Sequence, residues 1–174
     1  MKKLLEQLTN PLIFIALAVI LRIIPHVPNV APIGAMALFG GVYLNKRYAL
    51  LVPLVAMILS DIFLGFNAST PMVYASFILT GLIGLWLKNH KSVPTVALAS
   101  LTSSLLFYLL TNFNFWYATS LYPKTFSGMI DAYVMALPFF RNTIIGDLLY
   151  TGVLFGSFEC ARNLSKRFSL RIAT

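Results

Sequence analysis

Four charged side chains lie inside or at the edge of apolar stretches of this chain, where a charge is costly. They are Arg22, Asp61, Arg141 and Asp147, two of each sign. A charge at a lipid-facing helix centre costs about 2.5 to 3.5 kcal/mol on insertion scales, and pairing is the usual remedy. Two interpretations are open: the arginines neutralise the aspartates and lock a helical bundle, or some of these groups face a cavity and bind a polar ligand.

The composition explains why these charges stand out. The chain has 174 residues, of which 59% are apolar and 10% are charged, and its mean hydropathy is +0.83. Ordinary soluble domains carry about 25% charged residues, so a cytosolic globular domain is excluded. We expect residues 1–174 to form a single integral membrane domain, with the lipid bilayer as partner.

Prolines, glycines and charges divide the apolar sequence into six runs, which predict an all-α bundle of six transmembrane helices. The last four runs approach or exceed the roughly 20 residues that span a membrane. The first is short but lengthens backwards through Leu4, Leu5 and Leu8, with Asn10 and Pro11 as a helix cap or a kink. The second is rich in Gly and Ala, so it is tilted, broken or buried among its neighbours. The runs are 11–24, 31–44, 48–66, 71–87, 93–111 and 138–161.

Positive charges mark the expected orientation. Most of the thirteen Lys and Arg residues fall before the first run, after the last run, or between runs two and three and runs four and five. Only Lys124 lies in a connection on the opposite side. Cytoplasmic loops are enriched in Lys and Arg, so we expect an inner-membrane protein with both termini in the cytoplasm and the four intramembrane charges in the outer leaflet. Because the basic residues are dispersed among loop ends, nucleic acid is not an expected partner.

Polar residues recur at helical spacing on the last two runs. One stripe comprises Thr143, Asp147 and Thr151, and the other comprises Ser100, Ser104, Tyr108 and Asn112. Interhelical hydrogen bonding and close packing explain the deep serines best. Tyr108, Asn112 and Asn142 fall in the outer half of their helices, and we expect them to line a cavity together with Asp61 and Asp147.

The connection from Asn112 to Leu137 is long and aromatic. Connections of this length are usually functional or disordered, and this one is too aromatic for disorder. Its aromatic residues, Trp116 among them, either fold over the outer face as a lid or form an interfacial belt. The connection 25–32 holds three prolines and forms a stiff loop, in which His26 contacts a ligand or is simply solvated.

Enzymatic chemistry is not indicated. The sequence has no metalloprotease helix, Gly-rich phosphate loop or Ser/His/Asp set. Asp61 and Asp147 would serve as an acid/base or metal pair only if the two arginines left them free. The single cysteine, Cys160, cannot form an internal disulfide or a structural zinc site. We therefore expect no catalytic residue, no metal and no cofactor.

Two family resemblances add to this interpretation. The stretches APIGAMALFGG at 31–41 and VPLVAMILSDIFLGF at 52–66, followed by the 71–87 helix, resemble the core of the substrate-binding S components of energy-coupling-factor (ECF) vitamin transporters. The run ALPFFRNTIIGDLLY at 136–150, with TNF at 111–113 and LYPKT at 121–125, is similar to an uncharacterised bacterial family of small membrane proteins related to S components. This second resemblance covers nearly the whole chain. Together they imply a six-helix S-component fold and a vitamin-like substrate.

The resemblance also implies a coupling module as partner, which docks on an Ala-x-x-x-Ala pattern in helix one. The first run offers only Ala16 and Ala18, whereas Ala31 and Ala35 have that spacing on the second run. This departure leaves a solitary protein as the alternative. The expected function is capture and transport of a small polar molecule from the outer side, with Arg22, Asp61, Tyr108, Asn112, Trp116, Arg141, Asn142 and Asp147 as binding residues. The alternative is a non-transporting membrane scaffold subunit of an envelope complex, in which the polar cluster is packed solid.

Overall fold

The computed structural model of the chain describes residues 10–25 and 27–172, with side chains up to residue 165. Each of the six apolar runs is confirmed as a helix, and a seventh helix lies in the aromatic connection. The seven described helices are α2 (Pro11–Ile23), α3 (Ile33–Tyr43), α4 (Lys46–Leu64), α5 (Thr70–Leu87), α6 (Val93–Ala118), α7 (Phe126–Met135) and α8 (Leu137–Ile172).

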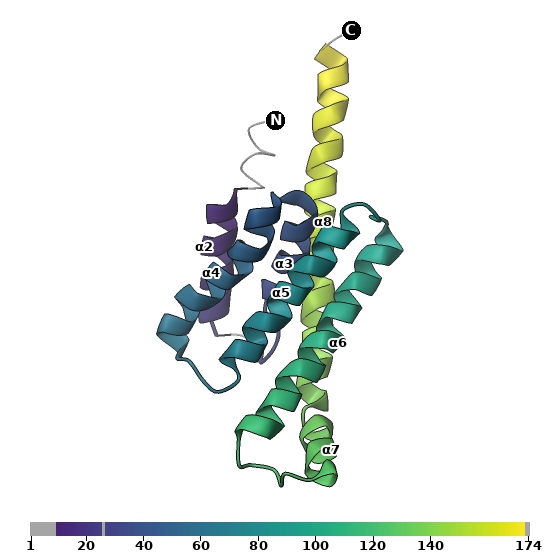
Figure 1. The fold of residues 1–174 in the computed structure, drawn as a ribbon. Helices are drawn as coiled ribbons and strands as arrows, with labels where there is room; N and C mark the ends of the chain where they lie inside the picture. The colour runs from purple at the N-terminus through teal and green to yellow at the C-terminus, as the bar shows by residue number, and fades with distance from the viewer. Residues whose placement is uncertain (1–9, 26, 173–174) are drawn as a thin grey trace.

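The long helices alternate in direction along the bundle (Figure 1). The connections formed by the described residues of 24–25 and 27–32, by 65–69 and by 119–125 lie at one end, which we call the proline-rich end after Pro25, Pro28 and Pro32. The connections around 44–45 and 88–92 lie at the opposite end, where α8 also leaves the bundle. We call this the basic end, because Lys46 and Lys91 lie there.

The short helix α3 forms the centre of the bundle. Every residue from Ile33 to Val42 is buried, as expected for a helix that is apolar all round. Its backbone touches that of α5: a Cβ added to Gly84 would lie 2.5 Å from the Leu38 carbonyl oxygen and 3.0 Å from the Cα of Gly41. Small residues allow this approach. Of the three possibilities for the second apolar run, burial among its neighbours is the one found.

An aromatic cluster around Phe39 joins α2, α3 and α8. The Phe39 ring stacks on Phe14 at 5.2 Å between centroids, and meets Phe155 and Phe158 edge-on, each at 5.4 Å. Tyr43, one turn further along α3, packs against Phe158 at 4.3 Å. Each such pair contributes about 0.5 to 1.5 kcal/mol beyond the burial of its area, so the cluster fixes the three helices against one another.

Four of the described helices are long and apolar enough to cross a membrane: α4, α5, α6 and the 137–165 part of α8. Large apolar side chains such as Leu12 (73% exposed) and Val93 (85% exposed) point away from the bundle, as lipid-facing residues do. These features make the chain a membrane protein.

Six full-length spans are not found among the described residues. With 13 and 11 residues, α2 and α3 fall short of the candidate spans. They are about 20 and 16 Å long, against roughly 30 Å of hydrocarbon. The proline-rich connection ends α2 at Ile23 and keeps α3 from starting before Ile33. At the other end of α3, Asn45 is already the N-cap of α4. Asn10 and Pro11 do cap α2, as one of the two interpretations had it. The proposed lengthening through Leu4, Leu5 and Leu8 lies outside the described residues.

The aromatic connection is mostly helical, which corrects the expectation of one long loop. Helix α6 continues through Asn112 and Trp116 to Ala118. Thr125 then caps α7, its side chain accepting a hydrogen bond from the backbone N–H of Gly128 at 3.1 Å. Only residues 119–125 connect the two helices.

Candidate functional site

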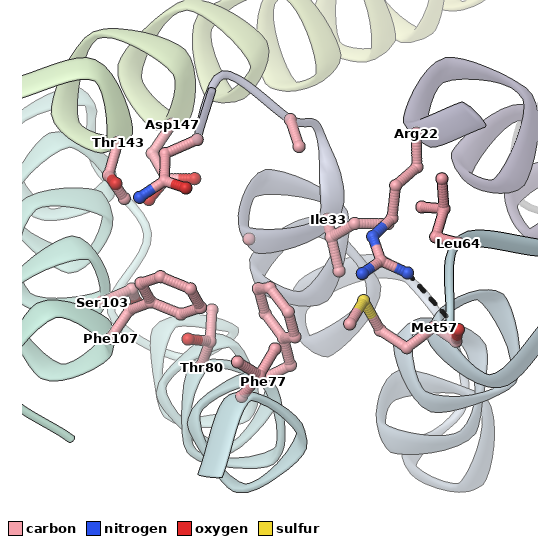
Figure 2. Close-up of a pocket in the computed structure, with 14 residues that line it drawn as sticks. Arg22, Ile33, Met57, Leu64, Phe77, Thr80, Ser103, Phe107, Thr143 and Asp147 are labelled. Carbon is pink, nitrogen blue, oxygen red and sulfur yellow. Dashed lines mark hydrogen bonds between the residues drawn. The ribbon is translucent and has the colours of Figure 1, made fainter. Parts of the chain in front are cut away.

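A partly open cavity of about 330 Å³ lies toward the proline-rich end, enclosed by α2, α3, α4, α5, α6 and α8 (Figure 2). Its volume lies at the lower limit of the range for small-molecule pockets, about 300 to 1,000 Å³. Apolar residues form most of the wall, with Phe77 and Phe107 side by side at 5.5 Å between ring centroids. The polar residues of the wall are Arg22, Asn29, Thr80, Ser103, Thr143 and Asp147.

Arg22 enters this wall near the end of α2 and pairs with Asp61 on α4. Its Nη1 donates to Asp61 Oδ1 at 2.6 Å, to the carbonyl oxygen of Met57 at 3.4 Å and to the Ser60 hydroxyl. Asp61 is 3% exposed and also accepts a hydrogen bond from the Tyr74 hydroxyl at 2.7 Å. The predicted arginine partner of Asp61 is confirmed. Asp61 itself lies behind Arg22 and is not a wall residue.

Asp147 faces the cavity from α8 without a cationic partner among the described residues. It is 8% exposed, and within the described ranges its carboxylate accepts one hydrogen bond, from the Ser104 hydroxyl to Oδ2 at 2.6 Å. The other oxygen, Oδ1, lies over Gly34, where an added Cβ would be only 2.5 Å away. The absent side chain of Gly34 therefore makes room for this carboxylate.

An arginine partner for Asp147 was expected, and this expectation is wrong. Arg141 is exposed and makes no ion pair within the described part of the chain. Six residues correspond to a rotation that leaves two side chains about 120° apart around a helix, so Arg141 and Asp147 point in different directions. The alternative partner, Arg22, is already paired with Asp61.

The two polar stripes face each other across α6 and α8, and they serve different purposes at different depths. Thr151 and Ser100 form a buried contact at 3.4 Å, and Ser104 bonds Asp147, so the serines make interhelical bonds as expected. Thr143, one turn before Asp147, lines the cavity. Packing and cavity lining, weighed as alternatives for these stripes, both occur.

Tyr108 and Asn112 line a second, smaller cavity of about 110 Å³. The Tyr108 hydroxyl donates to the Tyr133 carbonyl at 2.7 Å, and Asn112 Nδ2 donates to the Tyr108 carbonyl at 2.7 Å. They are thus cavity residues, but not in the wall of the larger cavity. The residues shared by both walls are Asn29, Phe107 and Thr143.

The aromatic residues between Phe113 and Tyr133 do not line the larger cavity, so of the two alternatives, a lid and an interfacial belt, a lid over this cavity is not found. Trp116 Nε1 donates to the Pro123 carbonyl at 2.9 Å, within its own connection. Because α6 continues to Ala118, it carries these residues past the cavity, and α7 packs on α6 beyond it (Figure 1). Asn142 instead ties α8 to the proline-rich connection, donating from Nδ2 to the Pro28 carbonyl at 3.1 Å.

Several wall residues were not anticipated from the sequence. Asn29 follows Pro28 and has a positive φ of 64°, a conformation that Asn tolerates, so the Pro-Asn pair was a usable signal. Phe77, Phe107 and Ser103 gave no signal, because in an apolar run such residues face lipid or core equally well. His26 lies outside the described residues. No group of three or more potential metal ligands occurs among the described side chains.

Comparison with known proteins gives one match. Residues 2–169 match the model of a family of unknown function, DUF6580. No curated protein and no solved structure matches the chain. A relation to the S components of ECF transporters is therefore not shown. Since the match extends over nearly all of the sequence, the chain belongs to the DUF6580 family of unknown function.

Proposed function

We propose that this protein binds a small polar molecule in the 330 Å³ cavity and takes part in its transport across the bacterial inner membrane. The observation that carries the proposal is the pair of charged groups on opposite sides of the cavity, Arg22 and Asp147 (Figure 2). Ionisable residues among membrane-spanning helices are costly and commonly mark substrate or ion pathways. A purely structural cluster would be packed solid, whereas here a buried carboxylate borders open volume.

The charge distribution supports entry from the outer side. Lys46, Arg47, Lys88 and Lys91 lie at the basic end of the bundle, whereas Lys124 lies at the proline-rich end. Applying the positive-inside rule, we place the basic end and both termini in the cytoplasm. The cavity then lies in the outer half of the protein.

The surroundings of α3 favour a protein that works without a shared coupling module. Ala35, which has the Ala-x-x-x-Ala spacing with Ala31, is completely buried within the bundle. Ala18 on α2 is 1% exposed. Ala16 is exposed and Ala31 is half-buried, so neither Ala16 and Ala18 nor Ala31 and Ala35 offer two alanines on the surface. The mode of docking implied by the S-component resemblance is therefore not part of our proposal.

A ligand screen on the purified protein tests the binding function. We expect a member of a vitamin and metabolite panel to raise the midpoint of thermal unfolding in detergent, because a ligand specific for the folded state stabilises it. The effect should be lost in Asp147→Asn and retained in Asp131→Asn, a matched change at an exposed position of α7. If no member of the panel raises the unfolding midpoint and an envelope protein co-purifies with the chain, the scaffold alternative would be favoured.

A further inference from the structure

The charges around the cavity do not cancel. Arg22 and Asp147 are the charged residues of its described wall. The positive charge of Arg22 is matched by Asp61 directly behind it, at 2.6 Å. Tyr74, the other partner of Asp61, is neutral. No cation among the described residues compensates the negative charge of Asp147, and a buried carboxylate without a cation is unfavourable.

The hydroxyl groups of the wall are arranged as acceptors toward the cavity. Thr80, Ser103 and Thr143 each donate their hydroxyl proton to a carbonyl oxygen of the preceding turn of their own helix, at 2.9, 2.9 and 3.0 Å. A hydroxyl has a single proton to donate, so their lone pairs alone remain for a ligand. Asn29 adds an amide with both a donor and an acceptor, but the carboxylate and the three hydroxyl groups offer acceptors. This part of the wall therefore suits a ligand rich in N–H donors.

Aromatic rings and the opposite wall complete the pattern. The faces of phenylalanine rings attract cations, and Phe77 and Phe107 lie beside the acceptor groups (Figure 2). On the other side, Arg22 uses only Nη1 in its hydrogen bonds with the described residues. The Nε and Nη2 protons of its guanidinium are thus available to an acceptor atom of the ligand.

We propose that the ligand is a small organic cation, with an ammonium or amidinium group bound by Asp147 and a hydrogen-bond acceptor facing Arg22. This inference rests on the proposed binding function and specifies its substrate class. The ligand's positive charge neutralises Asp147, and the hydroxyl oxygens of Thr143 and Ser103 accept hydrogen bonds from its remaining N–H groups.

Three probes of nearly equal shape and different charge test this class: benzamidinium, benzamide and benzoate. Their dissociation constants for the purified protein are measured from the dependence of the unfolding midpoint on probe concentration. We expect benzamidinium to bind at least about tenfold more tightly than benzamide. A hydrogen bond to a charged group contributes more net free energy than a neutral one, and the difference corresponds to about this factor in the dissociation constant. Benzoate should bind most weakly.

Two variants and one control assign the effect to Asp147. Asp147→Asn should abolish the preference for benzamidinium, and Asp131→Asn should retain it. Ser104→Ala keeps the carboxylate and removes its hydrogen bond, so the preference should persist there even if Asp147→Asn does not fold. Loss of the preference in Asp131→Asn, or its persistence in Asp147→Asn, would overturn the assignment.

The outcomes separate this inference from the function on which it rests. Two results would overturn the organic-cation class while leaving a binding site in place. One is tighter binding of benzoate than of benzamidinium. The other is stabilisation by sodium chloride, but not by choline chloride, when benzamidinium has no effect. If neither the probes nor the metabolite panel stabilises the protein, the binding function itself fails.

Discussion

Helix α8 carries two carboxylates about three turns apart, and the protein treats them differently. At the basic end, Glu159 accepts hydrogen bonds from Lys91 and Tyr43 and pairs with Arg162 at 3.0 Å. At the proline-rich end, the Asp147 carboxylate has the Ser104 hydroxyl as its one hydrogen-bond partner in the described part of the chain. The first carboxylate is saturated by the protein and acts as a structural tie. The second lacks a cationic partner among the described residues, as expected of a carboxylate that binds a ligand.

Open volume alone does not distinguish the two ends. A groove of about 410 Å³ also lies at the basic end, beside Lys91 and Glu159. Its other walls are largely apolar, and its charged groups already satisfy one another. The comparison teaches that the pairing of the charged groups, more than the size of a hollow, indicates where a polar ligand binds.

The largest expected effect comes from breaking the Arg22–Asp61 pair. Arg22→Met leaves Asp61 buried without its cation, and Asp61→Asn strands the guanidinium, at a cost of about 3 to 5 kcal/mol in each case. The double variant should lose clearly less than the sum of the single losses, as measured by unfolding in detergent. Arg141→Met, at an exposed position, is the control and should change little. Additive losses would show that Arg22 and Asp61 are not coupled.

A smaller effect is expected at the basic end. Glu159→Gln removes the anion shared by Lys91 and Arg162, but the side chain of Glu159 is 29% exposed, so solvent screens the remaining cations. We expect a loss of about 1 kcal/mol in unfolding free energy, typical of partly exposed ion pairs. A loss as large as that of Arg22→Met would mean that the basic end is the more strongly coupled region.

The smallest effect on the free energy of unfolding is expected at Asp147, where a substitution should cost almost nothing or stabilise the protein. Asp147→Asn removes an uncompensated buried charge, and the amide can still accept the Ser104 hydrogen bond. Without ligand, we expect the variant to be unchanged or more stable by up to about 1 kcal/mol. A destabilisation of several kcal/mol would reveal a cationic partner for Asp147, and the contrast with Glu159 would disappear.

A final experiment measures orientation instead of stability and determines which end of the bundle faces outward. In a Cys160→Ser background, single cysteines at positions 46 and 90 should resist an impermeant thiol reagent applied to intact cells, and a cysteine at position 124 should react. Labelling of position 46 from outside would invert the proposed orientation and place the cavity in the cytoplasmic half.

The helices could be predicted because their limits are encoded locally. Prolines, glycines and capping residues punctuate the apolar runs, and all six runs became helices. The extension of α6 to Ala118 was missed because its aromatic residues suit an interface as well as a helix. The cap of α7 at Thr125 was visible only as a single threonine within an apparently irregular segment.

The site was predictable in its residue types but not in its pairing. Arg22 and Asp61 are 39 positions apart, and their contact depends on how α2 and α4 are rotated against each other. The same applies to Ser104 and Asp147, 43 positions apart. Hydropathy gives the depth of a charge in the membrane, whereas the rotation of each helix is set by packing such as the Gly41–Gly84 contact. A sequence without its packing therefore cannot say which charge remains unpaired.

The length of α8 has a mechanical consequence. Its 36 residues extend about 54 Å, well beyond the roughly 30 Å of a hydrocarbon core, and its C-terminal part stands clear of the bundle (Figure 1). Asp147 lies on one side of the Phe155 and Phe158 contacts with Phe39, and the free part lies on the other. The aromatic contacts thus hold α8 between its two ends, about which a rigid helix would pivot. A small tilt at Asp147 would be magnified at the far tip, beyond the membrane surface.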